Sequence, residues 1–309
     1  MNELDIARHS RFIDPQLHVW GWEIPVYLFL GGMAAGTLFL SALLWSRPGP
    51  RSRAARLLPF IAPALLALGM GALFLDLSHK LHVFRFYLAF RWTSPMSWGA
   101  WILLIVFPIA ILFGLATIAD EDAEALAARV PALRRPVASG RAFALRHARG
   151  LRMAAAIAAV GLGGYTGVLL SALGARALWG SALLGPLFLV SGISSGAAFT
   201  MLMGVSADER AFLARADVHA MWLEVALILF FLVGLATGGG ASRAAADLVL
   251  GGPYTAPFWA LVVAAGLVVP SAMELLERRL HLAATAVAPA LVLVGGFALR
   301  WILVAAGQS

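Results

Sequence analysis

The sequence lacks cysteine and is poor in charge. Without cysteine, the chain has no thiolates to ligate an iron–sulfur cluster or a Cys-type zinc site, and it forms no disulfides. Charged residues make up 13% of the 309 residues, against about 25% in an ordinary soluble domain. Lysine occurs once, at Lys80, and the other basic residues are arginines between apolar runs. These deficits exclude a cytosolic enzyme, and any redox chemistry must use another kind of centre.

Long hydrophobic runs are abundant instead, since 61% of the residues are hydrophobic. A membrane-spanning helix needs about 20 consecutive apolar residues. Eight windows meet this length, at 23–45, 57–77, 97–118, 152–173, 181–203, 218–238, 255–274 and 283–306. The predicted fold is therefore an all-α, polytopic membrane protein with eight transmembrane helices, arranged as two four-helix bundles.

The loops between these spans predict the orientation of the chain. Fifteen of the 23 Lys and Arg residues lie in the loops around 46–56, 119–152, 204–217 and 275–282. Basic loops face the cytoplasm under the positive-inside rule, so both termini are expected outside. We therefore expect a multi-pass protein of a bacterial cytoplasmic (inner) membrane with periplasmic termini. From the charges in the first 22 residues we expect no removable signal peptide there.

Two spans share a glycine pattern at an offset of 160 residues. Gly32 and Gly36 in the first span match Gly192 and Gly196 in the fifth. Both spans run from outside to inside, which fits a duplicated four-helix unit whose Gly-x-x-x-Gly faces allow close packing. The alternative is that such small-residue spacing is simply common in membrane helices.

The spans and loops predict four parts of the chain. They are spans one to three with a connection at 78–96 (residues 1–118), a cytoplasmic connector (119–151), span four completing the first bundle (152–173), and the second bundle (174–309).

Ionisable side chains within a bilayer are costly, so each one is a candidate functional residue. Those placed toward the expected outer side are Glu23, Asp76, Tyr165 and Arg300. No histidine lies in the middle of a span, so ligation of haem by two histidines is not expected.

The connection at 78–96 interleaves basic and aromatic residues on the side where the orientation rule predicts little positive charge. Its basic members are His79, Lys80, His82, Arg85 and Arg91. The pattern predicts an interfacial helix, followed by a proline-marked start of the third span at Pro95. Two interpretations are open, membrane-surface anchoring and docking of a soluble partner, and the misplaced positive charge favours docking.

With these residues in view, the chain resembles the NrfD-like family, the integral membrane subunits of the polysulfide reductase type. The resemblance covers all eight spans and is most specific at 20–32, 76–77, 93–99 and 164–171. Many members follow Asp-Leu with a Gly-Arg-Pro-like turn, where this chain has Ser78-His79-Lys80-Leu81. That departure leaves the subfamily, and hence the substrate of the whole complex, open.

The resemblance implies a subunit with no haem and no iron–sulfur cluster of its own. It implies that the chain binds a quinone, menaquinone or ubiquinone, near the face where a four-cluster iron–sulfur subunit docks, with a molybdopterin catalytic subunit beyond. It further implies that Tyr165 and His18 contact the quinone head group and that Asp76 lies close by. In this hypothesis Asp76 and Glu23 exchange protons with the site.

Simpler roles remain open for the same residues. Asp76 and Arg85 are alternatively an ion pair at the interface, and Tyr165 and His18 are alternatively interfacial anchors.

Two carboxylates, Glu224 and Glu274, lie on the expected cytoplasmic side. They are candidates for a proton route, and the alternative is that each caps a helix or snorkels to the surface. For the whole chain, the alternatives to a quinone-reactive subunit are a secondary transporter with a four-plus-four helix repeat and a purely structural anchor.

Overall fold

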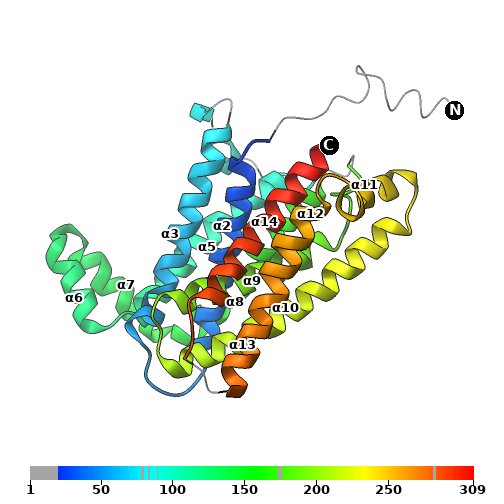
Figure 1. Cartoon of the computed structure of the whole chain (residues 1–309). Helices are drawn as coiled ribbons and strands as arrows, with labels where there is room; N and C mark the ends of the chain where they lie inside the picture. The colour runs from blue at the N-terminus through cyan, green and yellow to red at the C-terminus, as the bar shows by residue number, and fades with distance from the viewer. Residues whose placement is uncertain (1–19, 78–79, 83, 89, 173–175, 281–282) are drawn as a thin grey trace.

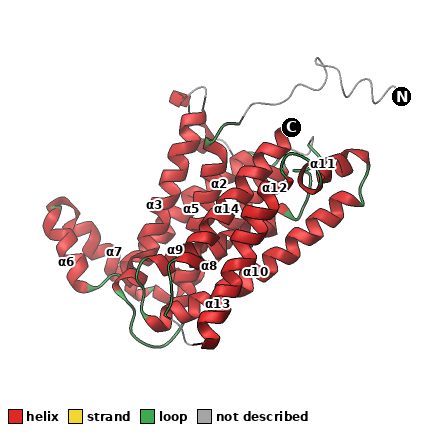
Figure 2. Cartoon of the chain, in the orientation of Figure 1, coloured by secondary structure: helices red, strands yellow, loops and turns green. Residues whose placement is uncertain are grey.

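The computed structural model describes residues 20–77, 80–82, 84–88, 90–172, 176–280 and 283–309. All regular secondary structure in these ranges is helical (Figure 2). Among the described residues, eight helices are long and apolar enough to cross a membrane, which confirms the predicted all-α polytopic fold. Two residues of the sequence hypothesis, His18 and His79, lie outside the described ranges.

Four of the long helices form the first ring. They are α2 (Glu23–Leu44), α3 (Arg53–Asp76), α5 (Pro95–Thr117) and α8 (Ala148–Ser171). Helix α2 packs against α3 and α8, and α5 also packs against both of them, so the four helices enclose a common core.

The other four spans form a second ring beside it. They are α9 (Leu184–Leu202), α10 (Ala207–Ala236), a continuous helix over Thr255–Leu280, and α14 (Val287–Gln308). The continuous helix consists of α12 (Thr255–Pro257), the π-helical η3 (Phe258–Val268) and α13 (Val269–Leu280). Helix α9 packs against both α10 and α14, and the two rings meet where α9 contacts α2 and α8.

The bundle has two ends, which we call the terminal face and the connector face. The start of α2 and the end of α14 lie together at the terminal face (Figure 1). There the Trp20 amide donates to the Gln308 side-chain oxygen over 2.9 Å, and the Gln308 amide nitrogen donates back to the Trp20 carbonyl over 3.1 Å. The helix α11 (Gly240–Leu250) lies at the same end (Figure 1).

The connector face carries the short helices between α5 and α8. These are α6 (Asp120–Arg129), η2 (Pro131–Leu133) and α7 (Arg134–Arg146), which project sideways from the bundle in Figure 1. Arg141 pairs with Asp120 over 2.6 Å, and Arg53 at the start of α3 pairs with Asp122 over 2.7 Å. The first ion pair joins α7 to α6 within the connector, and the second ties the connector to the first ring.

The glycines shared by the first and fifth spans bring α2 and α9 into backbone contact. A Cβ added to Gly36 would lie 2.0 Å from the Gly192 carbonyl oxygen, and one added to Gly196 would lie 2.5 Å from the Gly36 carbonyl carbon. A Cβ added to Gly192 would lie 2.7 Å from the Gly32 carbonyl oxygen. The close packing predicted for these Gly-x-x-x-Gly faces is confirmed, and the two faces pack against each other.

One helix boundary differs from the sequence prediction in a way that matters for the site. Helix α10 begins at Ala207, well before the predicted start at 218. A capping box explains the early start: the Ser206 hydroxyl accepts from the Glu209 amide, and the Glu209 carboxylate accepts from the Ser206 amide over 2.9 Å. Asp217, assigned to a loop from hydropathy, therefore lies inside the helix.

The connection between α3 and α5 also differs from its prediction. Its described residues form two short turns, η1 (Lys80–His82) and α4 (Arg85–Leu88), instead of one interfacial helix. The chain then folds back onto the start of α5, because the Arg91 amide donates to the Ser97 hydroxyl over 3.0 Å and the Trp98 indole donates to the Trp92 carbonyl over 2.9 Å. These hydrogen bonds occur here in place of the regular backbone hydrogen bonds of a helix.

The glycine contact predicts a large effect from a very small substitution. Gly36→Ala adds one carbon where the α9 backbone already lies, so the helices must separate, and we expect a loss of about 1–3 kcal/mol in the free energy of unfolding. Gly161→Ala on α8 is the matched control, because a Cβ there meets nothing within 4 Å. Thermal unfolding of the purified proteins in detergent, followed by tryptophan fluorescence, makes the comparison. Equal midpoints for the two variants would contradict the packing.

Candidate functional site

Tyr165 lies in the interior of the first ring, near the end of α8. Its side chain is 6% exposed and packs against the backbone of α5 at Gly99. A Cβ at Gly99 would lie 2.0 Å from the phenol oxygen, and the Gly99 backbone amide faces that oxygen. This burial favours a role inside the bundle over the alternative of an interfacial anchor.

A second tyrosine, Tyr27, lies beside Tyr165 and was missed by the sequence reasoning. It is 2% exposed on α2 and is close enough to interact electrostatically with both Tyr165 and Tyr87. We call Tyr27, Tyr87 and Tyr165 the tyrosine cluster. Partial burial raises the pKa of Tyr87 above its ordinary value, so this phenol remains an O–H donor at neutral pH.

Two carboxylates lie at the same end of the first ring. Glu23 begins α2 and Asp76 ends α3, both are partly buried, and they are close enough to interact electrostatically. Glu23 also lies one helical turn before Tyr27, on the same side of α2. The two side chains therefore form a carboxylate pair at this end of the first ring.

The structure therefore brings together three of the predicted site residues, Tyr165, Asp76 and Glu23, at the terminal face and adds Tyr27 to them. His18 lies outside the described residues. The side chain of Arg85 is likewise outside what is described, so its predicted pairing with Asp76 stays a prediction.

The connection after Asp76 exposes both charge and aromatic surface. Lys80, His82 and Arg91 of the predicted docking set are exposed. The apolar side chains beside them in the sequence are also largely exposed, at 53% for Phe84, 75% for Leu88 and 78% for Trp92. Phe90 packs edge-on against Trp92 with 4.7 Å between ring centroids, and also against Trp101. We call the described residues Lys80, His82, Phe84, Leu88 and Phe90–Trp92 the aromatic strip.

Three further predicted residues lie in the second ring, away from the tyrosine cluster. Glu224 and Glu274 are 2% and 3% exposed, so neither side chain snorkels to the surface. Arg300 is fully buried at the junction of the rings and donates to the Leu28 carbonyl over 3.3 Å and to the Ser191 hydroxyl over 3.0 Å. It also donates to the backbone carbonyls of Gly296 and Phe188.

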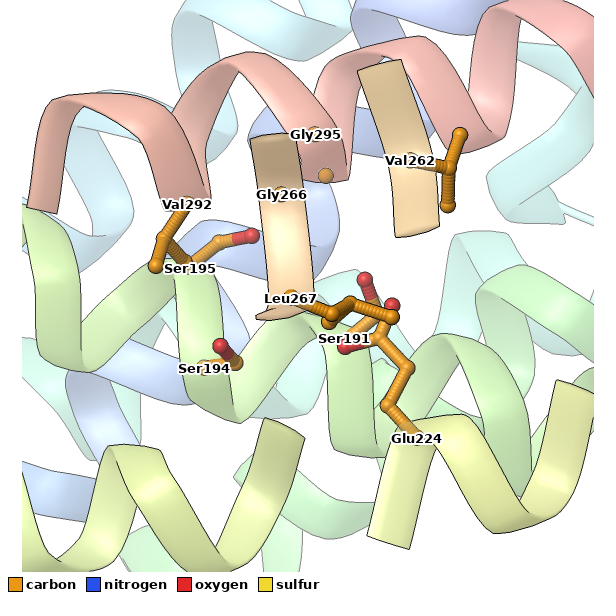
Figure 3. Close-up of a pocket in the computed structure, with 10 residues that line it drawn as sticks. Ser191, Ser194, Ser195, Glu224, Val262, Gly266, Leu267, Val292 and Gly295 are labelled. Atoms are coloured by element: carbon orange, nitrogen blue, oxygen red, sulfur yellow. The ribbon is translucent and has the colours of Figure 1, made fainter. Parts of the chain in front are cut away.

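A narrow pocket opens beside Glu224 in this second ring (Figure 3). Serine hydroxyls from α9 line one side and apolar side chains from the seventh and eighth spans line the other. Its lining residues are Ser191, Ser194, Ser195, Glu224, Val262, Gly266, Leu267, Val292, Gly295 and Gly296. Across the described ranges, no group of three His, Asp or Glu residues is arranged to hold a metal ion.

The polar residues thus form two separate groups. The tyrosine cluster with Glu23 and Asp76 offers phenol donors and carboxylates at the terminal face of the first ring. The second group, around Glu224, lies buried between α9, α10 and α14.

Comparisons with known proteins agree with this architecture. The family model described as "Polysulphide reductase, NrfD" matches residues 11–309. The protein is 33% identical over 303 residues to Protein NrfD of Escherichia coli (strain K12), covering 94% of the present sequence and 95% of that relative. It is 30% identical over 311 residues to the C subunit of polysulfide reductase from Wolinella succinogenes, covering 94% and 95%.

A third relative, the Protein NrfD homolog of Haemophilus influenzae, is 29% identical over 312 residues, covering 96% of each protein. The match to the family model spans nearly the whole sequence, and the similarity to these relatives is equally extensive. The chain belongs to the NrfD/polysulphide reductase family and is an integral membrane subunit of the type that anchors oxidoreductase complexes.

Proposed function

We propose that this subunit binds a quinone or quinol, and that it exchanges electrons between the quinone pool and a partner iron–sulfur subunit docked at the terminal face. The observation that carries the proposal is the tyrosine cluster beside Glu23 and Asp76. Buried phenols and a carboxylate pair meet there at one end of an otherwise apolar ring. An apolar site with a few convergent polar groups is the usual design of a small-molecule site.

The chemistry of a quinone matches these side chains. Reduction of a quinone takes up two electrons and two protons, so the site needs hydrogen-bond donors for the carbonyl oxygens and groups that exchange protons. Tyr165 and Tyr27 supply the O–H donors, and the sequence hypothesis adds His18 to them. Asp76 and Glu23 accept or release the protons. The electrons arrive by tunnelling, so this subunit needs no metal ligand of its own.

The aromatic strip supports docking of the partner beside this site. Exposed apolar rings and positive charge together are typical of protein interfaces, where aromatic residues and arginine are enriched. The docking set consists of His79, Lys80, His82, Arg85 and Arg91. In this proposal a four-cluster iron–sulfur subunit occupies the strip and a molybdopterin catalytic subunit binds beyond it.

The orientation follows from the charged loops. The basic connector face lies in the cytoplasm, and the terminal face, with the tyrosine cluster, lies on the periplasmic side of a bacterial inner membrane. Quinone exchange and partner docking then take place at the outer face.

Removal of one phenol hydroxyl tests the site. In the purified complex, Tyr165→Phe should reduce the efficiency of quinone-linked electron transfer by about 5- to 150-fold, because loss of one hydrogen bond to a buried group costs about 1–3 kcal/mol. A steady-state quinone titration measures the effect.

Tyr254→Phe is the matched control for this titration, since Tyr254 lies outside the cluster and faces Ser309 near the end of α14. Unchanged activity in an assembled Tyr165→Phe complex would overturn the site. A wild-type complex with no specific quinone-linked electron transfer would instead favour the structural anchor or the transporter.

Charge reversal in the aromatic strip tests the docking surface. The double substitution Lys80→Glu with Arg91→Glu should weaken partner binding by about 5- to 30-fold at low salt. Each glutamate places a negative charge where the proposal pairs a positive charge with an acidic group of the partner, so the binding free energy falls by about 1–2 kcal/mol. The dissociation constant, measured at several salt concentrations, should differ less from wild type as screening increases.

Arg243→Glu provides the control for the docking experiment, because Arg243 is exposed on α11 at the same face but in the second ring. Equal weakening by the control, or none by the double variant, would remove the strip as the docking surface.

A further inference from the structure

Among the described residues, the second ring buries Glu209 of the capping box and four further ionisable side chains, which come from three different helices. Asp217 and Arg300 are 0% exposed, Glu224 is 2% and Glu274 is 3% exposed. Asp217 and Glu224 stand two turns apart on the same side of α10, Glu274 lies on α13 and Arg300 on α14. Buried charges in a membrane protein are costly unless they are paired, so their grouping requires an explanation.

Serine hydroxyls on α9 contact three of these side chains. The Arg300 guanidinium donates to the Ser191 hydroxyl over 3.0 Å, and Ser191 is in turn hydrogen-bonded to the Glu224 carboxylate. Figure 3 shows the Glu224 side chain extending toward Ser191. One turn along α9, the Ser194 hydroxyl donates to the Asp217 carboxylate over 2.6 Å. Ser191 and Ser194 both line the pocket beside Glu224.

Glu274 extends this series toward the connector face. It is close enough to Asp217 for electrostatic interaction, and on its other side it faces Arg210, Glu277 and Arg278. Arg210 donates to the carbonyls of Met201 and Thr285, and Arg278 is exposed. The series therefore runs from the connector face to the centre of the second ring.

The charges of this group do not balance if every acid is ionised. The one fully buried guanidinium of the group, that of Arg300, faces Glu224, whereas the cations beside Glu274 are the partly buried Arg210 and the exposed Arg278. Both Glu274 oxygens and one Asp217 oxygen are buried without a hydrogen-bond partner among the described residues. A buried, unpaired carboxylate costs several kcal/mol, whereas a protonated acid is neutral. Binding of protons therefore keeps these groups buried at the lowest cost in free energy.

We propose that Glu274, Asp217 and Glu224, joined by Ser194 and Ser191, form a proton relay from the connector face to Arg300. At each step a neutral acid gives its proton to the next group, directly or through a serine hydroxyl that accepts one proton while it donates another. The donor becomes a carboxylate and no electron moves. Arrival at Glu224 neutralises the carboxylate that faces Arg300. The relay stands independently of the proposed quinone function.

The end of the relay touches the first ring. Arg300 donates to the Leu28 carbonyl, next to Tyr27 of the tyrosine cluster, and its guanidinium lies against Gly32. A change in the charge of Glu224 therefore changes the electrostatic interaction with Arg300, the residue that joins the second ring to α2.

Infrared spectroscopy of the full-length protein in lipid nanodiscs tests the relay. The carbonyl stretch of a neutral carboxylic acid is separate from the stretches of a carboxylate, and it shifts in D₂O. At neutral pH we expect bands of buried neutral acids in the wild type. Asp217→Asn and Glu274→Gln should each cause the loss of one band. Asp208→Asn, at an exposed position of the same helix, should leave the bands unchanged.

The kinetics of the D₂O shift distinguish a relay from isolated buried acids. Glutamine cannot pass on a proton, so Glu274→Gln should abolish the fast phase of deuteration of the Asp217 band. Ser194→Ala retains the carboxyl group and should move the Asp217 band to higher frequency, and this variant tests the assignment if Asp217→Asn does not fold.

Three results would overturn the relay. They are the absence of neutral acid bands at neutral pH, an unaltered deuteration rate in Glu274→Gln, and bands that change when sodium is replaced by choline. The last result would indicate a cation site.

Discussion

The backbone contact between α2 and α9 holds the two rings together at their centre. Because Gly36, Gly192 and Gly196 carry no side chains, the two helices meet backbone to backbone. The contact fixes the height of α2 relative to the second ring, and so determines where Tyr27 and Leu28 lie. Both polar groups of the protein are positioned through it.

Arg300 sits at the same junction and links the two polar groups. Its guanidinium reaches from α14 to the Leu28 carbonyl of α2 and to Ser191 of α9. The tyrosine cluster lies on one side of this link and the buried acids of the second ring on the other. In the two proposals, exchange of electrons and protons with the quinone belongs to the first ring and the proton relay to the second, with Arg300 in contact with both rings.

The sequence predicted the fold well because the length of a span is set by the thickness of the bilayer. The eight spans follow from hydropathy, and close helix packing at the Gly-x-x-x-Gly faces follows from their spacing, whereas the pairing of the two faces with each other is seen only in the structure. The predicted positions of helix ends were less accurate, because a polar first turn such as that of α10 carries no hydropathy signal. Asp217 was therefore assigned to a loop, although Ser206 and Glu209 have the spacing of a capping box.

The candidate site could be predicted only in part. Tyr165, Asp76 and Glu23 stand out as polar residues near span ends, whereas Tyr27 is hidden in an apolar run. Its spacing of one turn from Glu23 was the signal that could have revealed it. The break in the connection after Asp76 depends on bonds between Arg91 and Ser97 and between Trp98 and Trp92, which no periodicity predicts.

Quinone binding at the tyrosine cluster is open to a direct test. A photoreactive quinone analogue is cross-linked to the purified full-length protein, and the attachment sites are mapped by mass spectrometry. We expect cross-links in the segments around Tyr27, Gly99 and Tyr165 that an excess of unmodified quinone suppresses. Cross-links confined to the pocket around Ser194 and Glu224, or cross-links that no excess of quinone suppresses, would contradict quinone binding at this cluster.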